Sequence, residues 1–154
     1  VPMRVLPPAS EYPARLAELR RDLDALDAAD VGGRRRIMER QTMLAGERGV
    51  AERLRPGGPY YLHPEVQAIS FGPGCAILGL PGEFFAQSAR ALRAEAGVPD
   101  LLIACYTNHH VFYVVPKEAF GQGGYEPGVA MLDDTAEATF HAASLSLLRE
   151  ITGD

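Results

Sequence analysis

Two kinds of hydrophobic pattern divide this chain. Between residues 14 and 54, apolar side chains recur every three or four positions, which is typical of amphipathic helices. Asp30–Gly33 interrupts this pattern, and we expect a second helical run from Arg34 to about Leu54. The two runs predict an α-helical hairpin, and the proline-rich residues 1–13 before it should be extended. The stripe of the first run consists of Leu16, Leu19, Leu23 and Leu26.

After a glycine- and proline-rich loop at residues 55–59, the pattern becomes that of strands. Gly72-Pro73-Gly74 separates the first two strand-like runs, which therefore predict an antiparallel hairpin. The third run, Leu101–Tyr106, is continuously apolar and predicts a strand that is buried on both faces. The four runs are Val66–Phe71, Cys75–Leu80, Leu101–Tyr106 and Val111–Val115.

Helical segments alternate with these strands. We expect a helix from Phe84 to Ala96, ended by Gly97, one helical turn at Lys117–Phe120, and a loop at Gly121–Gly128. A final helix follows a cap at Asp133, Asp134 or Thr135. Its apolar face comprises Ala136, Phe140, Ala143, Leu147 and Ile151.

The alternation of strands and helices predicts the α/β class, with a mixed sheet, covering helices and a preceding α-helical hairpin. We expect residues 1–58 to form the extended N-terminal segment and the hairpin or linker. Residues 59–154 should form the α/β portion.

Charge and length exclude some classes of function. The net charge of −5 argues against a nucleic-acid binder, and no apolar run approaches the ~20 residues of a transmembrane segment. Ten of the 14 arginines fall between Arg15 and Arg55, but eight acidic residues are interleaved with them. This composition favours a solvated helical surface over a phosphate-binding patch. The chain lacks an initiating Met, so we expect it to be a piece of something longer, and we predict no compartment.

One acidic residue is a candidate metal ligand or base. Glu83 follows a strand-like run and, in this interpretation, begins a helix, where the helix dipole favours a carboxylate. Asn108–Tyr113 follows another strand, so the two segments would converge if their strands are neighbours. Carboxylate and phenolate oxygens both bind hard or borderline metals. His109 and His110 are adjacent and should point to opposite faces of a strand, so they should not share one metal.

Two other groups offer nucleophilic chemistry. Cys105 with His109 or His110 would be a thiol and a base, but its apolar run favours a small buried hydrophobe, and Cys75 has the same interpretation. Ser144 or Ser146 with His141 is the remaining combination, on a helix that otherwise looks structural. His63, before a proline, is expected at the surface.

Three segments together resemble a known family. Gly79–Phe84, Asn108–Tyr113 and Gly124–Glu126 occur in an order and at separations similar to those of the neutral/alkaline, non-lysosomal ceramidases, in the C-terminal part of the catalytic region. The match is strongest from about Val66 to Ile151 and suggests a bacterial ceramidase-like protein.

The resemblance implies a zinc-dependent amidase that cleaves the N-acyl bond of ceramide or a related lipid. Glu83 matches the glutamate ligand in Pro-Gly-Glu, and Tyr113 matches the tyrosine ligand that ends Asn-x-Tyr-x-x-Tyr. Asn108 matches the first residue of that motif, whereas His110 replaces its first aromatic residue, and both are expected beside the ligands. The family's two zinc histidines and its catalytic serine belong to earlier sequence, so neither they nor the nucleophile is expected here.

Two ligands leave a four-coordinate zinc incomplete, so the chain alone should be inactive. Its expected partners are a lipid-like N-acyl substrate and the missing N-terminal part of the same protein, with which it would form a larger catalytic domain. One alternative is a non-catalytic α/β module that binds a partner through the hairpin of residues 15–55. Another is an esterase that needs no metal.

Overall fold

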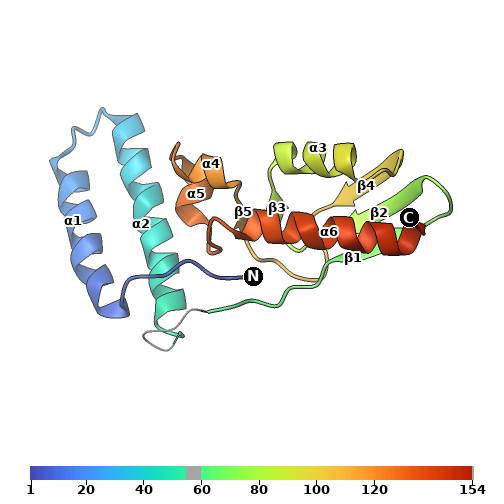
Figure 1. Ribbon diagram of the computed structural model, residues 1–154. Coiled ribbons are helices and arrows are strands. Elements are labelled where there is room, and N and C mark those ends of the chain that lie inside the picture. The colour runs from blue at the N-terminus through green and yellow to red at the C-terminus, as the bar shows by residue number, and fades with distance from the viewer. Residues whose placement is uncertain (55–59, 154) are drawn as a thin grey trace. The chain divides into compact units, whose positions relative to one another are not determined.

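The computed structural model describes residues 1–54 and 60–153 (Figure 1). The chain divides into two compact units. The α/β unit comprises Val1–Arg4 and Pro59–Asp154, and the helical unit comprises Val5–Gly58. The predicted loop at residues 55–59 lies outside the described residues.

The helical unit is a hairpin of two helices, as predicted. A short 3-10 helix, η1 (Ala9–Glu11), precedes α1 (Tyr12–Ala25) and α2 (Val31–Ala51). Both α-helices begin earlier than expected, because Pro13 is tolerated in a first turn and Asp30 is an N-cap. The Asp30 carboxylate accepts a hydrogen bond from the Gly33 amide at 2.8 Å. The residues that were expected to interrupt the helical pattern therefore start α2.

The two helices of the hairpin are joined by side-chain contacts as well as by packing. The guanidinium of Arg34 donates hydrogen bonds to the carbonyls of Leu23 and Leu26, at 3.0 and 3.3 Å. These carbonyls lie at the end of α1, where no intrahelical donor is left for them. Tyr12 at the start of α1 is fully buried. Arg34 of α2 thus supplies hydrogen-bond donors to carbonyl groups at the C-terminus of α1.

The main sheet of the α/β unit has three strands in the order β1-β2-β4. β1 pairs with β2 in an antiparallel manner, which confirms the predicted hairpin, and β2 pairs with β4 in parallel. A second, parallel sheet contains only β3 and β5. The strands are β1 (Gln67–Ser70), β2 (Cys75–Gly79), β3 (Glu83–Phe84), β4 (Asp100–Ala104) and β5 (Tyr113–Val114).

Helices cover one face of the main sheet. Leu92 of α3 (Ala86–Glu95) and Leu148 of α6 (Ala136–Thr152) join the core formed with Leu78 and Leu101. Gly97, with φ 67°, ends α3 as predicted. The face that α6 buries differs from the expected one, because Ala143 is exposed. The observed buried face consists of Ala136, Phe140, Ser144 and Leu148.

The opposite face of the main sheet carries exposed apolar side chains in the described part of the α/β unit. Leu101 is 4% exposed and Leu102 is 61% exposed, so the prediction that this strand is buried on both faces is wrong. Ile69 and Leu102 both pair in register with Ile77, and the three side chains form an apolar row across the three strands. A continuous apolar run predicts a strand, but it does not show which face of that strand is covered by other described residues.

The N-terminal residues Val1–Arg4 are part of the α/β unit. The N-terminal ammonium donates to the Leu62 carbonyl at 2.7 Å, and isolated bridges join Pro2 to Tyr61 and Met3 to Leu132. A second core cluster lies beside these contacts. It consists of Val111, Val114, Leu132, Ala136 and Phe140.

Two short helices precede α6. The predicted turn α4 (Lys117–Phe120) is present, but α5 (Tyr125–Val129) occupies part of the glycine-rich stretch that was expected to be a loop. Arg4 donates hydrogen bonds to carbonyls at the end of α5, including that of Ala130 at 2.9 Å. Of the described helices, none is long and apolar enough to cross a bilayer.

Candidate metal centre

The sequence predicted Glu83 at the start of a helix, and this prediction is wrong. Glu83 lies in the two-residue strand β3. Its amide donates to the Phe112 carbonyl at 2.9 Å, and α3 begins only at Ala86. Gly82 makes this close approach possible, because a Cβ there would lie 2.7 Å from the same carbonyl oxygen. Backbone pairing, and not a helix dipole, therefore positions the carboxylate.

Tyr113 lies directly opposite Glu83 in the small sheet. The register of β3 and β5 pairs these two residues with each other. Paired residues of neighbouring strands project to the same face, so the carboxylate and the phenol share one side of the sheet. The two groups interact electrostatically, and the nearby Glu83 carboxylate raises the pKa of the Tyr113 phenol. Two oxygen-bearing side chains that are far apart in the sequence thus meet at one point.

The loop before β5 contains unusual backbone conformations. Tyr106, Asn108 and Phe112 have φ values of 60°, 62° and 62°, in the left-handed region that side chains with a Cβ rarely adopt. Asparagine tolerates this region, whereas a bulky aromatic residue is a real outlier there. Two aromatic outliers within one short loop mark it as a constrained segment, and such segments cluster at functional sites.

His110 of this loop lies beside the carboxylate. Its Nε2 is 3.6 Å from Glu83 Oε1, and its ring centroid lies 5.3 Å from that of Tyr106 and 5.1 Å from that of Phe112. The predicted proximity of His110 to Glu83 is therefore present in the structure. His109 and Asn108 are exposed, and no hydrogen bond among the described residues joins either of them to Glu83.

Tyr106 belongs to the same cluster, although the sequence analysis did not single it out. Its phenol and the Glu83 carboxylate line the same hollow, and each shifts the pKa of the other. In the sequence it is only the last residue of an apolar run, where it reads as part of a strand. The strand β4 ends at Ala104, so Tyr106 is free to turn toward Glu83.

The contacts of these groups determine their protonation. Partial burial would by itself raise the pKa of Glu83, but the hydrogen bonds from Tyr106 and Tyr113 and the neighbouring His110 outweigh it, so the pKa is lowered. The hydrogen bond to Glu83, burial and the charge of that carboxylate raise the pKa of Tyr113 to about 12. The same causes raise the pKa of Tyr106. At neutral pH the cluster is an ionised carboxylate held by two neutral phenols.

A hollow of about 310 Å³ opens beside the carboxylate. One part of its wall is apolar and another carries the oxygen atoms of the cluster, together with a second carboxylate from α5. The Tyr125 ring of α5 meets the Tyr113 ring edge-on, with centroids 6.0 Å apart. The residues that line the hollow are Glu83, Phe84, Phe85, Cys105, Tyr106, Tyr113 and Glu126.

These residues fit part of a zinc site. Glu83 and Tyr113 present two oxygen ligands of a type that zinc accepts, on the same face and at the rim of a hollow. Within residues 1–54 and 60–153, no group of three or more His, Cys, Asp or Glu side chains is arranged to hold a metal ion. A four-coordinate ion would therefore need ligands besides those that the described residues supply.

The other candidate groups do not assemble. Ser144 is fully buried, whereas the His141 Nε2 lies 3.1 Å from a Glu95 carboxylate oxygen, so this histidine is paired elsewhere. Cys105 is half-buried at the hollow, and no hydrogen bond among the described residues joins it to either neighbouring histidine. His63 is exposed, as expected.

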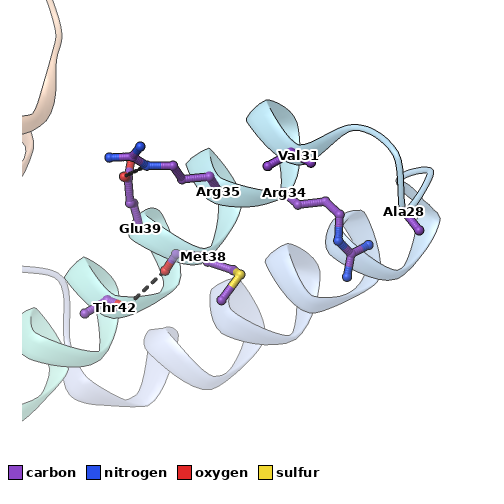
Figure 2. A pocket seen from close by; sticks show the side chains of 7 residues that line it. All are labelled: Ala28, Val31, Arg34, Arg35, Met38, Glu39 and Thr42. Atoms are coloured by element: carbon purple, nitrogen blue, oxygen red, sulfur yellow. Dashed lines mark hydrogen bonds and ion pairs between the residues drawn. The ribbon is translucent and has the colours of Figure 1, made fainter.

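The helical unit contains a separate hollow, which Figure 2 shows along α2. Its polar groups are occupied, because Arg35 pairs with Glu39 at 2.8 Å and Thr42 donates to the Met38 carbonyl at 3.0 Å. Similar pairs four residues apart, such as Arg48 with Glu52 at 2.7 Å, recur along α2. This pattern fits a solvated arginine-rich surface whose charges are locally balanced.

Comparison with known proteins gives a partial match. No protein-family model matches this sequence, and no curated protein matches it. A solved structure described as a ceramidase complexed with C2 aligns with a TM-score of 0.51 and 22% identity, over 57% of this chain and 15% of that chain. The neutral ceramidase from Pseudomonas aeruginosa aligns with a TM-score of 0.44 and 20% identity, over 52% of this chain and 14% of that chain.

The first of these alignments shows that more than half of this chain has a ceramidase-like fold. The chain spans only about one seventh of the length of either neighbour. The fold expectation from the resemblance is thus confirmed over this part of the chain.

Proposed function

We propose that this chain is the C-terminal portion of the catalytic region of a zinc-dependent amidohydrolase that resembles neutral ceramidase. Its reaction would be hydrolysis of the N-acyl amide bond of ceramide or a related lipid. The observation that carries the proposal is the pairing of Glu83 with Tyr113 across β3 and β5. The ceramidase-like fold is the second support.

In this proposal Glu83 and Tyr113 hold the metal. Glu83 is ionised at neutral pH and can bind a cation. Burial opposes its ionisation, but Tyr106, Tyr113 and His110 outweigh burial and lower its pKa. The pKa of Tyr113 is raised to about 12, so its hydroxyl is protonated at neutral pH. It must lose this proton to bind a metal as a phenolate. The positive charge of a cation favours that loss, so ligation by Tyr113 would depend on the metal itself. When bound, zinc supplies a Lewis acid that polarises the amide carbonyl.

The hollow beside Glu83 would receive the substrate. Phe84 and Phe85 give it an apolar wall, and Glu126 and Tyr106 give it a polar rim. An N-acyl lipid likewise has an apolar hydrocarbon chain, which would contact the wall, and a polar amide group, which would lie at the rim. The remaining zinc ligands, the nucleophile and the rest of the substrate pocket would come from outside the described residues, and residues 1–154 alone should hydrolyse nothing.

The test is zinc content and hydrolysis of N-acyl-sphingosine in the full-length parent protein, with Glu83→Ala and Tyr113→Phe. Each variant should lower zinc affinity by more than about tenfold, since loss of even an outer partner of a ligand costs 10–100-fold. Glu65→Ala and Tyr61→Phe, at exposed positions of the α/β unit, are the matched controls. Normal zinc content and activity in both site variants would rule out the proposal.

A further inference from the structure

Tyr106 has a backbone conformation that its own burial does not explain. Its φ is 60°, yet its side chain is 57% exposed, so little core packing compensates for the strain. Its amide donates to the Gly82 carbonyl at 3.3 Å, which ties the residue to the peptide unit just before Glu83. The strained conformation thus brings Tyr106 next to Glu83.

The side chain of Tyr106 makes its contacts at the site. It lines the hollow together with Glu83 and Tyr113. Its ring lies beside His110, whose Nε2 is 3.6 Å from Glu83 Oε1. Tyr106 thus lies beside Glu83 at the hollow and comes from the loop after β4, whereas Tyr113 faces Glu83 from β5.

We propose that Tyr106 is a positioning residue, which fixes the rotamer of the Glu83 carboxylate at the rim of the hollow. The inference rests on the proposed function, in which this carboxylate is a metal ligand. A ligand with two rotatable bonds before its carboxyl group binds more tightly when outer hydrogen bonds restrict it. The unfavourable left-handed conformation of Tyr106 is then retained because it places the Tyr106 hydroxyl beside Glu83.

The first experiment needs no metal and uses the whole chain. NMR couplings of the Glu83 side chain report its rotamers in the wild type, in Tyr106→Phe and in the control Tyr61→Phe. Tyr61 is a similarly exposed tyrosine of the same unit, at 59%. We expect one dominant rotamer in the wild type and the control, and rotamer averaging in Tyr106→Phe. A single unchanged Glu83 rotamer in Tyr106→Phe overturns the inference.

A second variant separates positioning from packing. Tyr106→Gly removes the same hydroxyl but accepts a positive φ without strain. We expect averaging of Glu83 in this variant together with an unchanged or higher melting temperature. A fall in melting temperature with Glu83 still fixed would instead show that the ring serves the fold, and would also overturn the inference.

Zinc titration of the full-length parent keeps this inference distinct from the proposed function. Tyr106→Phe should weaken zinc binding about 10-fold or more, and Glu83→Gln should weaken it further. If Glu83→Gln leaves zinc affinity unchanged, the proposed function fails. If Glu83→Gln reduces the affinity and Tyr106→Phe does not, only the positioning role of Tyr106 fails.

Discussion

Glu83 and Tyr113 are direct partners across two parallel strands that are each two residues long. The side-chain repeat of a strand is two residues, so a slip of one residue would send one of the two groups to the other face. Backbone contacts on both sides oppose such a slip. Val111 donates to the Pro81 carbonyl at 2.8 Å, and Glu83 donates to the Phe112 carbonyl at 2.9 Å. The relative position of the carboxylate and the phenol is therefore set by the main chain.

This relationship predicts a loss of stability at alkaline pH. Tyr113 has a pKa of about 12 in the folded chain and an ordinary value of 10 when unfolded, so the folded chain holds this proton more tightly. Its contribution to the free energy of unfolding is complete below pH 10 and is lost as the pH rises toward 12. Urea unfolding at several pH values should show that the free energy of unfolding declines less steeply in this window for Tyr113→Phe than for the wild type. An identical decline in the wild type and the variant would contradict the assignment.

Gly82→Ala should destabilise the α/β unit by about 1–3 kcal/mol, because its Cβ would overpack a rigid backbone. That Cβ would lie 2.7 Å from the Phe112 carbonyl oxygen and 2.9 Å from a Val111 methyl group. Gly121→Ala is the control, since Gly121 has φ −75° and its Cβ would lie 3.9 Å from the nearest atom. Chemical unfolding should show a lower midpoint for Gly82→Ala and a change within about 0.5 kcal/mol for Gly121→Ala. Equal midpoints for the two variants would mean that the loop yields to the added methyl group.

Ser144→Ala should stabilise the chain by about 1 kcal/mol. Ser144 is fully buried on α6, and its hydroxyl has no hydrogen-bond partner among the described residues. Alanine removes that group and is the better helix former. Ser146→Ala, at an exposed position of the same helix, gains only the difference in helix propensity. Calorimetry should therefore give a higher melting temperature for Ser144→Ala than for Ser146→Ala, and the reverse order would show that the Ser144 hydroxyl is satisfied.

The α/β unit should fold without the helical unit. Residues 1–4 pair with residues that follow the hairpin, and the Met3 amide donates to the Tyr60 carbonyl at 2.8 Å. Replacing residues 5–58 with a short glycine–serine linker therefore closes a smaller loop at the same place. A smaller loop costs less closure entropy, so the free energy of unfolding should stay the same or rise by at most about 2 kcal/mol. Circular dichroism and urea unfolding check this, and an unfolded deletion variant would show that the hairpin supports the rest of the chain.

Local signals in the sequence were sufficient for much of the fold. The Gly72-Pro73-Gly74 turn between two apolar runs predicted the β1–β2 hairpin, because turn chemistry acts over a few residues. The C-terminal glycines of α3 and α6 were equally informative, since Gly97 and Gly153 both have a positive φ. The Asp30 cap carried a signal of the same kind, a side-chain acceptor three residues before Gly33. It was missed because the two glycines after Val31 seemed to break the helix.

The site depended on tertiary structure that local patterns do not carry. Strands of two residues have no periodicity to detect, so Glu83 was assigned to the helix that follows it. Glu83 and the segment Asn108–Tyr113 were candidates from their positions after two strands, the family resemblance singled out Tyr113, and the structure pairs Glu83 with Tyr113. Tyr106 was missed because its role depends on a left-handed backbone that propensity rules assign to glycine or asparagine.

The apolar row of Ile69, Ile77 and Leu102 has a thermodynamic consequence. Ile69 and Leu102 are 56% and 61% exposed in the folded chain, so more than half of their surface stays in contact with water. Their burial therefore contributes less to the free energy of folding than that of a fully buried side chain. The part that stays exposed lowers the solubility of the isolated chain, because an apolar surface in water favours association.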